Sequence, residues 1–255
     1  MDGHRSDNIP TNLRLLMVLE EVSRAGHPIT LREVNDRLGL PKPTMHRLFS
    51  TLLEEGFLER DLGGRAYLPG PRLRRLAGGI LSSSGMRQAR QSILTKLSVT
   101  IGETCNIALP DGDWMMYLER VETEWPLRIQ LPPGTRVPMY CTASGKMYLS
   151  SLAPRALETY LGSVTLEPRT DITFTDRDAL VAELVAIRER GYAMDRGEFM
   201  PDMIAVAVPV LDTNDRVLAT LSVHAPTQRL DLPGALACLP QLKNSARQLA
   251  ALVSG

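Results

Sequence analysis

Residues 29–61 read ITLREVNDRLGLPKPTMHRLFSTLLEEGFLERD, and this stretch decides the fold of the N-terminal part of the chain. Thr30 and Glu33 have the spacing of a capping box, in which each side chain satisfies a free backbone N–H at a helix start. The pattern therefore predicts a short helix from about Leu31, and Gly39 is its stop signal.

A second helix is expected directly after this turn. Lys42, Pro43 and Thr44 predict its start, because proline suits the first helical turn, where its missing N–H is no loss. Its apolar face carries Leu48, Leu52 and Leu53, and Gly56 follows as the stop signal. Two short helices joined by a glycine-containing turn have the size of a helix-turn-helix.

The flanking sequence predicts a winged form of this motif. Upstream, apolar residues at i, i+3, i+4 and i+7 indicate a helix that ends at Gly26; they are Leu15, Val18, Leu19 and Val22. Downstream, residues 57–60 and 65–68 are short strand candidates, joined by a turn at 61–64. A hairpin directly after the third helix makes a wing.

The third helix of such a unit would enter the major groove of DNA with its N-terminal residues near the base edges. We expect DNA contacts from the hydrogen-bond donors of this helix and of the wing: Lys42, Thr44, His46, Arg47, Ser50, Arg60 and Arg65. Residues 42–75 hold seven basic and four acidic residues, although the whole chain has a net charge of +0. A local basic patch matters more for DNA contact than the total charge. The alternative for any one of these side chains is an ordinary solvated surface.

Composition limits the class of protein. The chain has 255 residues, 44% of them hydrophobic and 23% charged, which is typical of one large or two small globular domains. The longest apolar run, at 203–211, has nine residues, and a membrane-spanning helix needs about 20. The N-terminus lacks the apolar segment of a secretory signal. Cys105, Cys141 and Cys238 are far apart and odd in number, which favours a reduced, cytoplasmic protein over a disulfide scaffold.

The C-terminal two thirds of the chain have the pattern of an α+β domain. The glycine pair Gly78 and Gly79 and the serines before Gly85 mark a linker. The pattern predicts helices over 86–101, 143–152 and 177–187, and a last helix over 232–252 with Pro240 as a candidate break. Strand candidates are 105–109, 114–120, 127–131, 204–211 and 217–223. Strands flanked by helices in this order predict a central antiparallel sheet.

Enzyme motifs are weak in this sequence. Ser144, Gly145 and Lys146 have part of the pattern of a phosphate-binding loop, yet position 147 is Met where Ser or Thr is required, and position 140 is Tyr where Gly is required. Cys141 has no His nearby in the sequence to act as its base. The histidines lie at spacings unlike any metal or triad signature; they are His4, His27, His46 and His224. We expect no catalysis, no cofactor and no bound metal.

The sequence resembles the IclR family of bacterial transcriptional regulators. The stretch at 29–61 carries the resemblance together with YLPGPRLRRLAGG at 67–79 and GETCNIALPDGDWMMYLERVE at 102–122. The resemblance continues in PPGTRVPMYCTASGKMYLSSL at 132–152 and GYAMDRGEFMPDMIAVAVPVLDTNDRVLATLSVHAPTQR at 191–229. These blocks stand in the family's order, and together they cover nearly the whole chain.

The resemblance implies a domain organisation. A winged helix-turn-helix DNA-binding domain is expected at 1–70, a linker helix at 71–85, and an effector-binding domain with a GAF-like, profilin-like fold at 86–255. It also implies dimers that pair into tetramers. Candidate dimer surfaces are the apolar face of the first helix and that of the linker helix, which carries Leu73, Leu76 and Ile80.

The helix start near residue 143 is a candidate effector site. Free backbone N–H groups at a helix start favour an anion such as a carboxylate. From the local sequence alone, a plain helix start packed on the sheet is an equal alternative. In the resembling family the matching loop contacts the effector. The resemblance thus implies a pocket formed by Pro126, Ile129, Val137, Cys141, Ala143, Ser144, Asp195, Ala205, Ser222 and His224.

The roles expected in this pocket follow from side-chain chemistry. Asp195 would hold a ligand hydroxyl, Ser222 would donate to a carboxylate, and His224 would pair with a carboxylate when protonated. Some family members carry Cys at the position of Ala205 and Ser at that of His224, so the effector need not be a two- or three-carbon oxoacid. Seven methionines between 115 and 203 either fill the core or line a pocket for a larger acid, such as an aromatic carboxylate.

The sequence therefore predicts a cytoplasmic, ligand-responsive DNA-binding regulator. We expect a dimer or tetramer that represses a catabolic operon from a pseudo-palindromic site and responds to a small organic acid. The alternatives are an activator of the same family, an enzyme on a sensor-like fold, and an adaptor whose winged helix binds protein.

Overall fold

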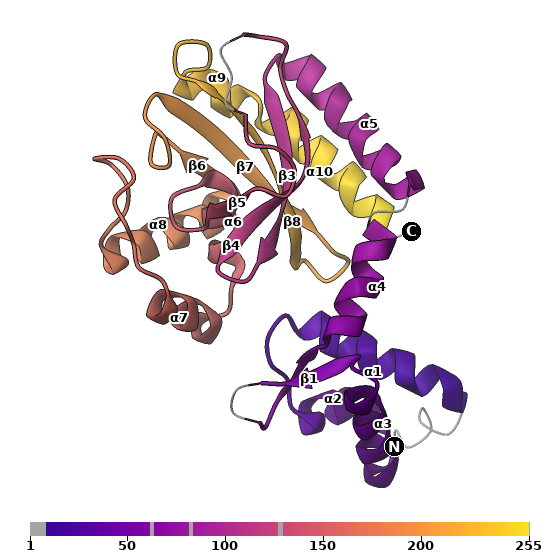
Figure 1. Cartoon of the computed structure of the whole chain (residues 1–255). Coiled ribbons are helices and arrows are strands. Elements are labelled where there is room, and N and C mark those ends of the chain that lie inside the picture. The colour runs from indigo at the N-terminus through magenta and orange to yellow at the C-terminus, as the bar shows by residue number, and fades with distance from the viewer. Residues whose placement is uncertain (1–8, 62–63, 82–83, 127–129, 255) are drawn as a thin grey trace. The chain divides into compact units, whose positions relative to one another are not determined.

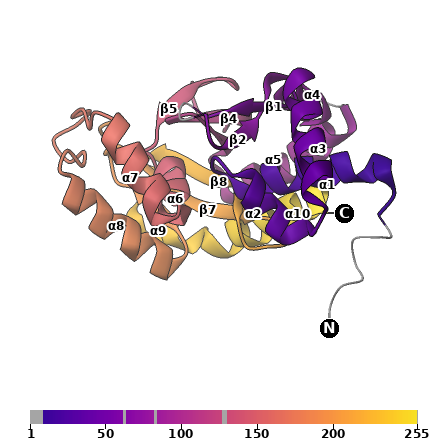
Figure 2. The same ribbon diagram turned by 90° about the horizontal axis from the view of Figure 1, so that it is seen from below.

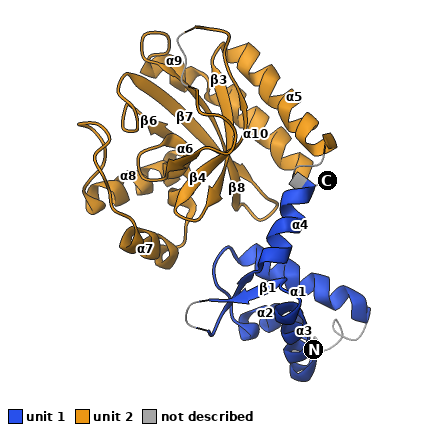
Figure 3. Cartoon of the chain, in the orientation of Figure 1, with its two compact units in different colours: residues 1–83 blue, residues 84–255 orange. Residues whose placement is uncertain are grey.

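The computed structural model describes residues 9–61, 64–81, 84–126 and 130–254. The chain forms two compact units, Met1–Ser83 and Ser84–Gly255 (Figure 3). Each unit has its own hydrophobic core. No helix in the described part of the chain is long and apolar enough to cross a membrane.

The N-terminal unit is the predicted winged helix-turn-helix (Figure 1). Its elements, in chain order, are α1 (Thr11–Ala25), α2 (Leu31–Leu38), α3 (Lys42–Glu54), β1 (Leu58–Arg60), β2 (Tyr67–Pro69) and α4 (Pro71–Leu81). The two strands pair antiparallel and form the wing. The capping box is present: the Thr30 hydroxyl accepts from the backbone N–H of Glu33, and the Glu33 carboxylate accepts from that of Thr30.

The core of this unit lies between the three helices and the hairpin. It consists mainly of Val18, Val22, Ile29, Val34, Leu40, Met45, Leu48, Phe49, Leu52 and Leu58. Phe49, which the sequence analysis did not place in the core, is almost fully buried, and its ring packs edge-on against Tyr67 at 4.6 Å between centroids. This contact joins α3 to the wing and so helps to fix the position of the wing beside α3.

The C-terminal unit is built on one antiparallel sheet of six strands. The strands are β3 (Thr104–Asp111), β4 (Trp114–Val121), β5 (Arg136–Pro138), β6 (Ala193–Asp195), β7 (Met203–Leu211) and β8 (Val217–Pro226), in the spatial order β5-β4-β3-β8-β7-β6. The helices are α5 (Ser84–Ile101), α6 (Ala143–Ser151), α7 (Pro154–Ser163), α8 (Arg177–Arg190), α9 (Leu232–Ala237) and α10 (Leu239–Ser254).

Helices cover both faces of this sheet. The helices α5 and α10 pack on one face, over a core of alternating residues such as Ile107, Leu221 and Val223. The helix α6 packs on the other face, backed by α8. In two views α6, α7 and α8 lie on the opposite side of the sheet from α10 (Figure 1 and Figure 2). Residues of even number on β8, such as Ser222 and His224, therefore face α6.

A β-bulge changes which side chains of β4 face α6. Tyr117 pairs with Ala108, but Glu119 pairs with Ile107, so the register shifts by one residue between them. Tyr117 consequently faces α6, Glu119 turns to α5, where Arg90 contacts it at 3.0 Å, and Arg120 returns to the α6 face opposite Asn106. The bulge thus brings a charged side chain to the α6 side of the sheet.

The predicted elements and the observed ones differ in a few places. Three short elements were not predicted: β5, β6 and α7. The strand expected at 127–131 is wrong for its last two residues, which lie in no strand, and 127–129 lie outside the described residues. The final helix breaks at Cys238, and Pro240 lies in the first turn of α10, which a proline tolerates. Gly78 and Gly79 lie inside α4 and do not interrupt it.

Candidate functional site

The surface of α3 that turns away from the core is polar. Met45, Leu48, Phe49 and Leu52 point inward. The remaining face carries the donors predicted to contact DNA, of which Lys42, His46, Arg47 and Ser50 are exposed and Thr44 is half-buried. The structure therefore brings the five predicted helix residues onto one exposed side of α3.

The wing carries the other two predicted residues. Arg60 and Arg65 are both exposed. The guanidinium of Arg60 folds back on the hairpin, donates to the carbonyl of Gly64 at 2.6 Å and lies 5.3 Å from the centre of the Tyr67 ring. Arg60 thus stabilises the wing. Arg65 contacts Asp61 through its backbone N–H.

Two further arginines of the region 42–75 form ion pairs within the N-terminal unit. Arg72 on α4 contacts the carboxylate of Glu55 at 2.6 Å, and Arg74 contacts that of Glu59 at 2.7 Å. These pairs are exposed, so each contributes little stability. They join α4 to the end of α3 and to β1.

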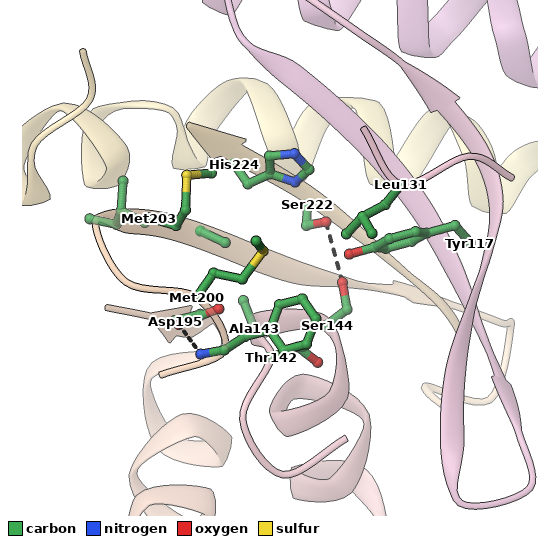
Figure 4. Close-up of a pocket in the computed structure, with 13 residues that line it drawn as sticks. Tyr117, Leu131, Thr142, Ala143, Ser144, Asp195, Met200, Met203, Ser222 and His224 are labelled. Atoms are coloured by element: carbon green, nitrogen blue, oxygen red, sulfur yellow. Dashed lines mark hydrogen bonds between the residues drawn. The ribbon is translucent and has the colours of Figure 1, made fainter. Parts of the chain in front are cut away.

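The C-terminal unit holds a pocket between the sheet and the start of α6 (Figure 4). Its cavity volume is about 30 Å³, within about 440 Å³ of space that includes open solvent. Six of the ten predicted effector residues line it: Ala143, Ser144, Asp195, Ala205, Ser222 and His224. They come from α6, β6, β7 and β8, which are far apart in the sequence, so the fold brings these six residues together.

The other four predicted residues do not line this pocket. Val137 and Cys141 are buried in the core between α6 and the sheet, and burial raises the pKa of the Cys141 thiol to about 12. Pro126 is exposed on the surface. Ile129 lies outside the described residues. The structure therefore does not bring Val137, Cys141 and Pro126 together with the six lining residues, because their side chains lie in the core or in solvent.

The lining includes residues that the sequence analysis missed. They are Tyr117, Leu131, Thr142, Phe199 and Ile204. Of the seven methionines considered for the pocket, Met200 and Met203 line it, while Met115, Met139, Met147 and Met194 are core residues. The sequence does not show to which face of the sheet Tyr117 points, because the bulge in β4 changes the alternation of its side chains.

The start of α6 packs closely against the backbone of Met139. The Thr142 hydroxyl caps the helix by accepting from the backbone N–H of Gly145 at 3.1 Å. A Cβ at Gly145 would lie 2.2 Å from the Met139 Cα, so only glycine lets α6 pack this tightly. The first N–H groups of a helix have no partner within it, and here they belong to pocket residues Ala143 and Ser144. The Ser144 hydroxyl donates to that of Ser222 at 3.3 Å (Figure 4).

Asp195 shapes one wall of the pocket. Its Oδ1 accepts from the backbone N–H groups of Gly197 at 3.1 Å, Glu198 at 2.7 Å and Phe199 at 3.3 Å. Burial raises the pKa of Asp195 to about 6, although Lys146 acts in the opposite direction. This oxygen therefore holds the turn that carries Phe199 and Met200, and the ligand hydroxyl expected at Asp195 stays a prediction.

A buried ion pair supports the same wall. Lys146 on α6 is fully buried, and its ammonium binds both carboxylate oxygens of Glu198 and lies 5.1 Å from the centre of the Phe174 ring. Burial raises the pKa of Glu198 to about 7, against the effect of Lys146. The lysine that resembled a phosphate-loop residue in the sequence thus has a structural partner.

His224 lies on the pocket wall in a setting that opposes protonation. Burial, followed by the charge of Arg120, lowers its pKa to about 3. Asn106 Nδ2 lies 2.9 Å from His224 Nδ1, and Arg120 Nη2 lies 3.3 Å from His224 Nε2. This lowered pKa favours the neutral ring and so opposes the predicted pairing of a protonated His224 with a carboxylate.

Nothing in the described residues indicates a metal site, since no group of three or more His, Cys, Asp or Glu side chains is placed to hold an ion there. The pocket offers hydroxyls, backbone N–H groups and apolar walls. Such a lining can bind and orient a small molecule.

Comparisons with known proteins agree with this arrangement. Residues 13–62 match the family described as IclR helix-turn-helix domain, and 78–251 match Bacterial transcriptional regulator IclR C-terminal. Both descriptions are of transcriptional regulators, which confirms the prediction that the chain is not an enzyme.

Individual relatives cover nearly the whole chain. The probable transcriptional regulator SauR of Cupriavidus necator is 38% identical over 237 residues, which are 93% of this chain and 94% of that protein. The DNA-binding transcriptional repressor YiaJ of Escherichia coli is 30% identical over 239 residues, 92% of this chain and 85% of that protein. The inducer-binding domain of a PobR double mutant from Acinetobacter, solved with 3-hydroxybenzoic acid, has a TM-score of 0.59 and 27% identity and covers 64% of this chain and 96% of that one. The chain belongs to the IclR family of bacterial transcriptional regulators.

Proposed function

We propose that this regulator represses transcription by binding a pseudo-palindromic DNA site as a dimer, and that a small organic carboxylate in the pocket releases it. The observation that carries this proposal is the pocket at the start of α6, with its hydroxyls and apolar walls, in the same chain as the exposed donor face of α3. The protein would act in the cytoplasm, where bacterial DNA lies.

The chemistry of the pocket favours an acid. The N-terminus of α6 carries a partial positive charge, and the hydroxyls of Ser144 and Ser222 lie beside it. Apolar walls from Tyr117, Leu131 and Phe199 suit a carbon skeleton, including an aromatic one. The inducer-binding domain of the PobR double mutant was solved with 3-hydroxybenzoic acid, which supports an aromatic carboxylate as a candidate.

The proposed DNA contacts are those of α3 and the wing: Lys42, Thr44, His46, Arg47, Ser50, Arg60 and Arg65. A single winged unit covers too little DNA for specific binding, so two copies are needed. The repressor role is supported by the relative YiaJ, which is named a repressor. The dimer surface would lie on α1 and α4, where Leu13, Leu16, Leu76 and Ile80 are exposed.

We propose a division of labour along the chain. Residues 1–70 would bind DNA, 71–85 would link, and 86–255 would bind the effector. The acid would act by binding one arrangement of the effector domains more tightly than another, which changes the spacing of the two reading heads. A dimer of dimers would extend this arrangement to a tetramer.

The DNA-binding role is tested by fluorescence anisotropy on the DNA upstream of the gene that encodes the protein, over a series of salt concentrations. Arg47→Ala should weaken binding by about 1–3 kcal/mol if Arg47 contacts a base, or reduce the salt slope by about 1 if it contacts a phosphate. Arg155→Ala, an exposed arginine on α7, is the matched control and should bind normally. Wild-type affinity and slope in Arg47→Ala would remove Arg47 from the interface.

The effector role is tested by calorimetry with a panel of small carboxylic acids. We expect an acid that binds wild type to bind Ser222→Ala about tenfold more weakly, because a hydrogen bond to a carboxylate is lost. The control is Ser151→Ala, a hydroxyl at the far end of α6 that bonds only to its own helix. Equal affinities in wild type and Ser222→Ala would remove this hydroxyl from the site.

A further inference from the structure

Asp195 brings an unpaired carboxylate oxygen to the effector pocket (Figure 4). Its Oδ1 accepts from the backbone N–H groups of Gly197, Glu198 and Phe199, whereas no described residue donates to Oδ2. Asp195 is 6% exposed, so this oxygen lies in a nearly enclosed setting. A buried carboxylate oxygen is costly without a hydrogen-bond partner, and the group that satisfies Oδ2 has to come from the pocket.

The buried cation that acts on Asp195 already has a partner. The ammonium of Lys146 binds both carboxylate oxygens of Glu198. Lys146 and Glu198 are both buried, and together they carry no net charge when both are ionised. Lys146 therefore acts on Asp195 without an ion pair between them, and the negative charge of Asp195 is left over in this part of the unit.

The other elements around Asp195 supply no cation that contacts its carboxylate. Their titratable groups are Tyr117, Cys141, His224, Arg120 and Arg196. Burial raises the pKa of Tyr117 and of Cys141 to about 12, so both are neutral, and the pKa of His224 is lowered to about 3. Arg120 forms an ion pair with Glu122, and Arg196 is exposed. An ionised Asp195 thus makes the pocket unfavourable for a second anion.

An effector carboxylate would share this small space with Asp195. The cavity of about 30 Å³ has room for about two water molecules, so a carboxylate at the start of α6 lies close to Oδ2. The helix start offers about half an elementary positive charge, which does not balance two carboxylates. Two carboxylates in one site raise the pKa of one of them strongly. A single proton between the two groups replaces their repulsion with a strong O–H···O⁻ hydrogen bond.

We propose that the effector binds together with one proton from solvent, which Asp195 holds on Oδ2 and donates in a hydrogen bond to the carboxylate of the effector. The inference rests on the proposed function and deepens it, because it states the charge state in which the site takes its acid. The only bond that forms is the O–H bond of Asp195, and the effector stays ionised.

The setting of Asp195 favours this role before any effector arrives. Burial raises its pKa to about 6, against the effects of Lys146 and of the three backbone N–H groups. Those N–H groups all bind Oδ1, so a proton on Oδ2 leaves the turn that carries Phe199 in place. A buried carboxylic acid that is kept neutral is a hydrogen-bond donor for an anion.

The test is calorimetry of the full-length protein with butanoate, pyruvate, benzoate and 3-hydroxybenzoate. For an acid that binds, the binding enthalpy is measured at pH 7 in two buffers of different ionisation enthalpy, which gives the number of protons taken up. We expect more than about half a proton per effector, and an affinity that falls about fivefold between pH 6.5 and 7.5. The primary amide of the same acid is the ligand control: if it binds, it should do so without proton uptake, since it is neutral.

Asp195→Asn assigns the proton. Its amide oxygen can still accept from the turn, and its NH₂ group stands where the proposal places the O–H. This variant should take up less than about 0.2 protons, and its affinity should change less than about twofold between pH 6.5 and 7.5. At pH 7.5 it should bind the acid at least as tightly as wild type. Asp178→Asn on α8, an exposed carboxylate, is the matched control and should behave as wild type.

Two further measurements keep the test open if Asp195→Asn fails to fold, which its thermal unfolding midpoint would reveal. In wild type, difference infrared spectra with the acid labelled with ¹³C at its carboxyl group should show an unlabelled protonated carboxyl group appearing on binding. His224→Asn should keep the proton uptake, because His224 is not the group that takes up the proton.

The outcomes separate this inference from the proposed function. An acid that binds wild type without proton uptake would overturn the shared proton and leave the proposed function standing; this is the result for an effector hydroxyl that donates to an ionised Asp195. Uptake that persists in folded Asp195→Asn, or that is lost in His224→Asn, would overturn the assignment to Asp195. Binding of none of the acids would overturn both.

Discussion

The protonation and contacts of single residues depend on partners from other strands. These partners meet because their side chains point to the same face of the sheet. Burial of its ring and the charge of Arg120 lower the pKa of His224 to about 3, which favours the neutral ring. The sequence alone indicated a pocket residue but not its protonation, because Asn106 and Arg120 come from other strands. A bulge in β4 is needed to bring Arg120 to that face.

The lowered pKa of His224 predicts how stability depends on pH. The folded state excludes a proton that the unfolded state takes up below about pH 6.5, so folding loses about 1.4 kcal/mol per pH unit from this residue as the pH falls towards the folded pKa. The raised pKa values of Asp195 and Glu198 act in the opposite direction, because their proton uptake favours the folded state. Comparison with His224→Asn isolates the histidine.

The measurement is urea unfolding of both proteins between pH 6 and 5. Wild type should lose stability relative to His224→Asn as the pH falls. A constant difference between the two proteins across this range would contradict the lowered pKa.

Thr220 provides a second prediction at this scale. Its Oγ1 is buried on β8 without a hydrogen-bond partner. Thr220→Val should therefore raise the free energy of unfolding by about 1 kcal/mol, since it removes an unsatisfied polar group at nearly constant shape. The matched control is Thr104→Val, which removes a hydroxyl that accepts from the Thr123 backbone N–H at 3.1 Å and should destabilise by a similar amount. Loss of stability in both variants would show that Thr220 has a partner after all.

Helices whose ends carry strong capping signals were predictable from the sequence. The short strands β5 and β6 were not. The capping box before α2 and the αL glycines after α1 and α2 act within a few residues, so the sequence indicated these helices and their ends. The strands β5 and β6 have three residues each and exist only because β4 and β7 pair with them. Pro209 is tolerated inside β7 because β6 pairs with residues 205–207 only, so beyond them this edge of β7 needs no donor.

The start of α6 gives a prediction at the scale of an element. Gly145→Ala would place a Cβ against the Met139 backbone, which cannot move as a side chain can. We expect a loss of more than about 3 kcal/mol in unfolding free energy, together with the loss of acid binding. Gly162→Ala on α7, where a Cβ meets open space, is the control and should be close to neutral. Wild-type stability in Gly145→Ala would mean that α6 stands farther from the sheet.

At the scale of the whole molecule, the resemblance to the family predicted more than the residue pattern did. The winged helix-turn-helix and the central antiparallel sheet are as expected, although two of the six strands were not predicted, and six of the ten predicted effector residues line one pocket. The remaining lining includes Phe199 and Met200 on the turn held by Asp195, and side chains of β4 and β7 such as Tyr117, whose direction depends on the bulge in β4.

Assembly gives the prediction for the whole molecule. Leu76 and Ile80 on α4 are each 55% exposed, which is unusual for two large apolar residues one turn apart. The double variant Leu76→Glu, Ile80→Glu should sediment as a smaller species than wild type and bind the upstream DNA about tenfold or more weakly, because specific sites need two copies. Val185→Glu on α8, also exposed, should leave both properties unchanged. An unaltered sedimentation coefficient in the double variant would exclude this face of α4 from the dimer.

The most direct test of the account is a mobility-shift assay of the purified protein on its own upstream DNA, at low salt, with and without the acids that bind by calorimetry. The account predicts a shifted complex that one of these acids releases in wild type, and that the same acid concentration releases far less in Ser222→Ala. No shifted complex at low salt would contradict the DNA-binding role, and a complex that no bound acid alters would contradict the link between the pocket and DNA.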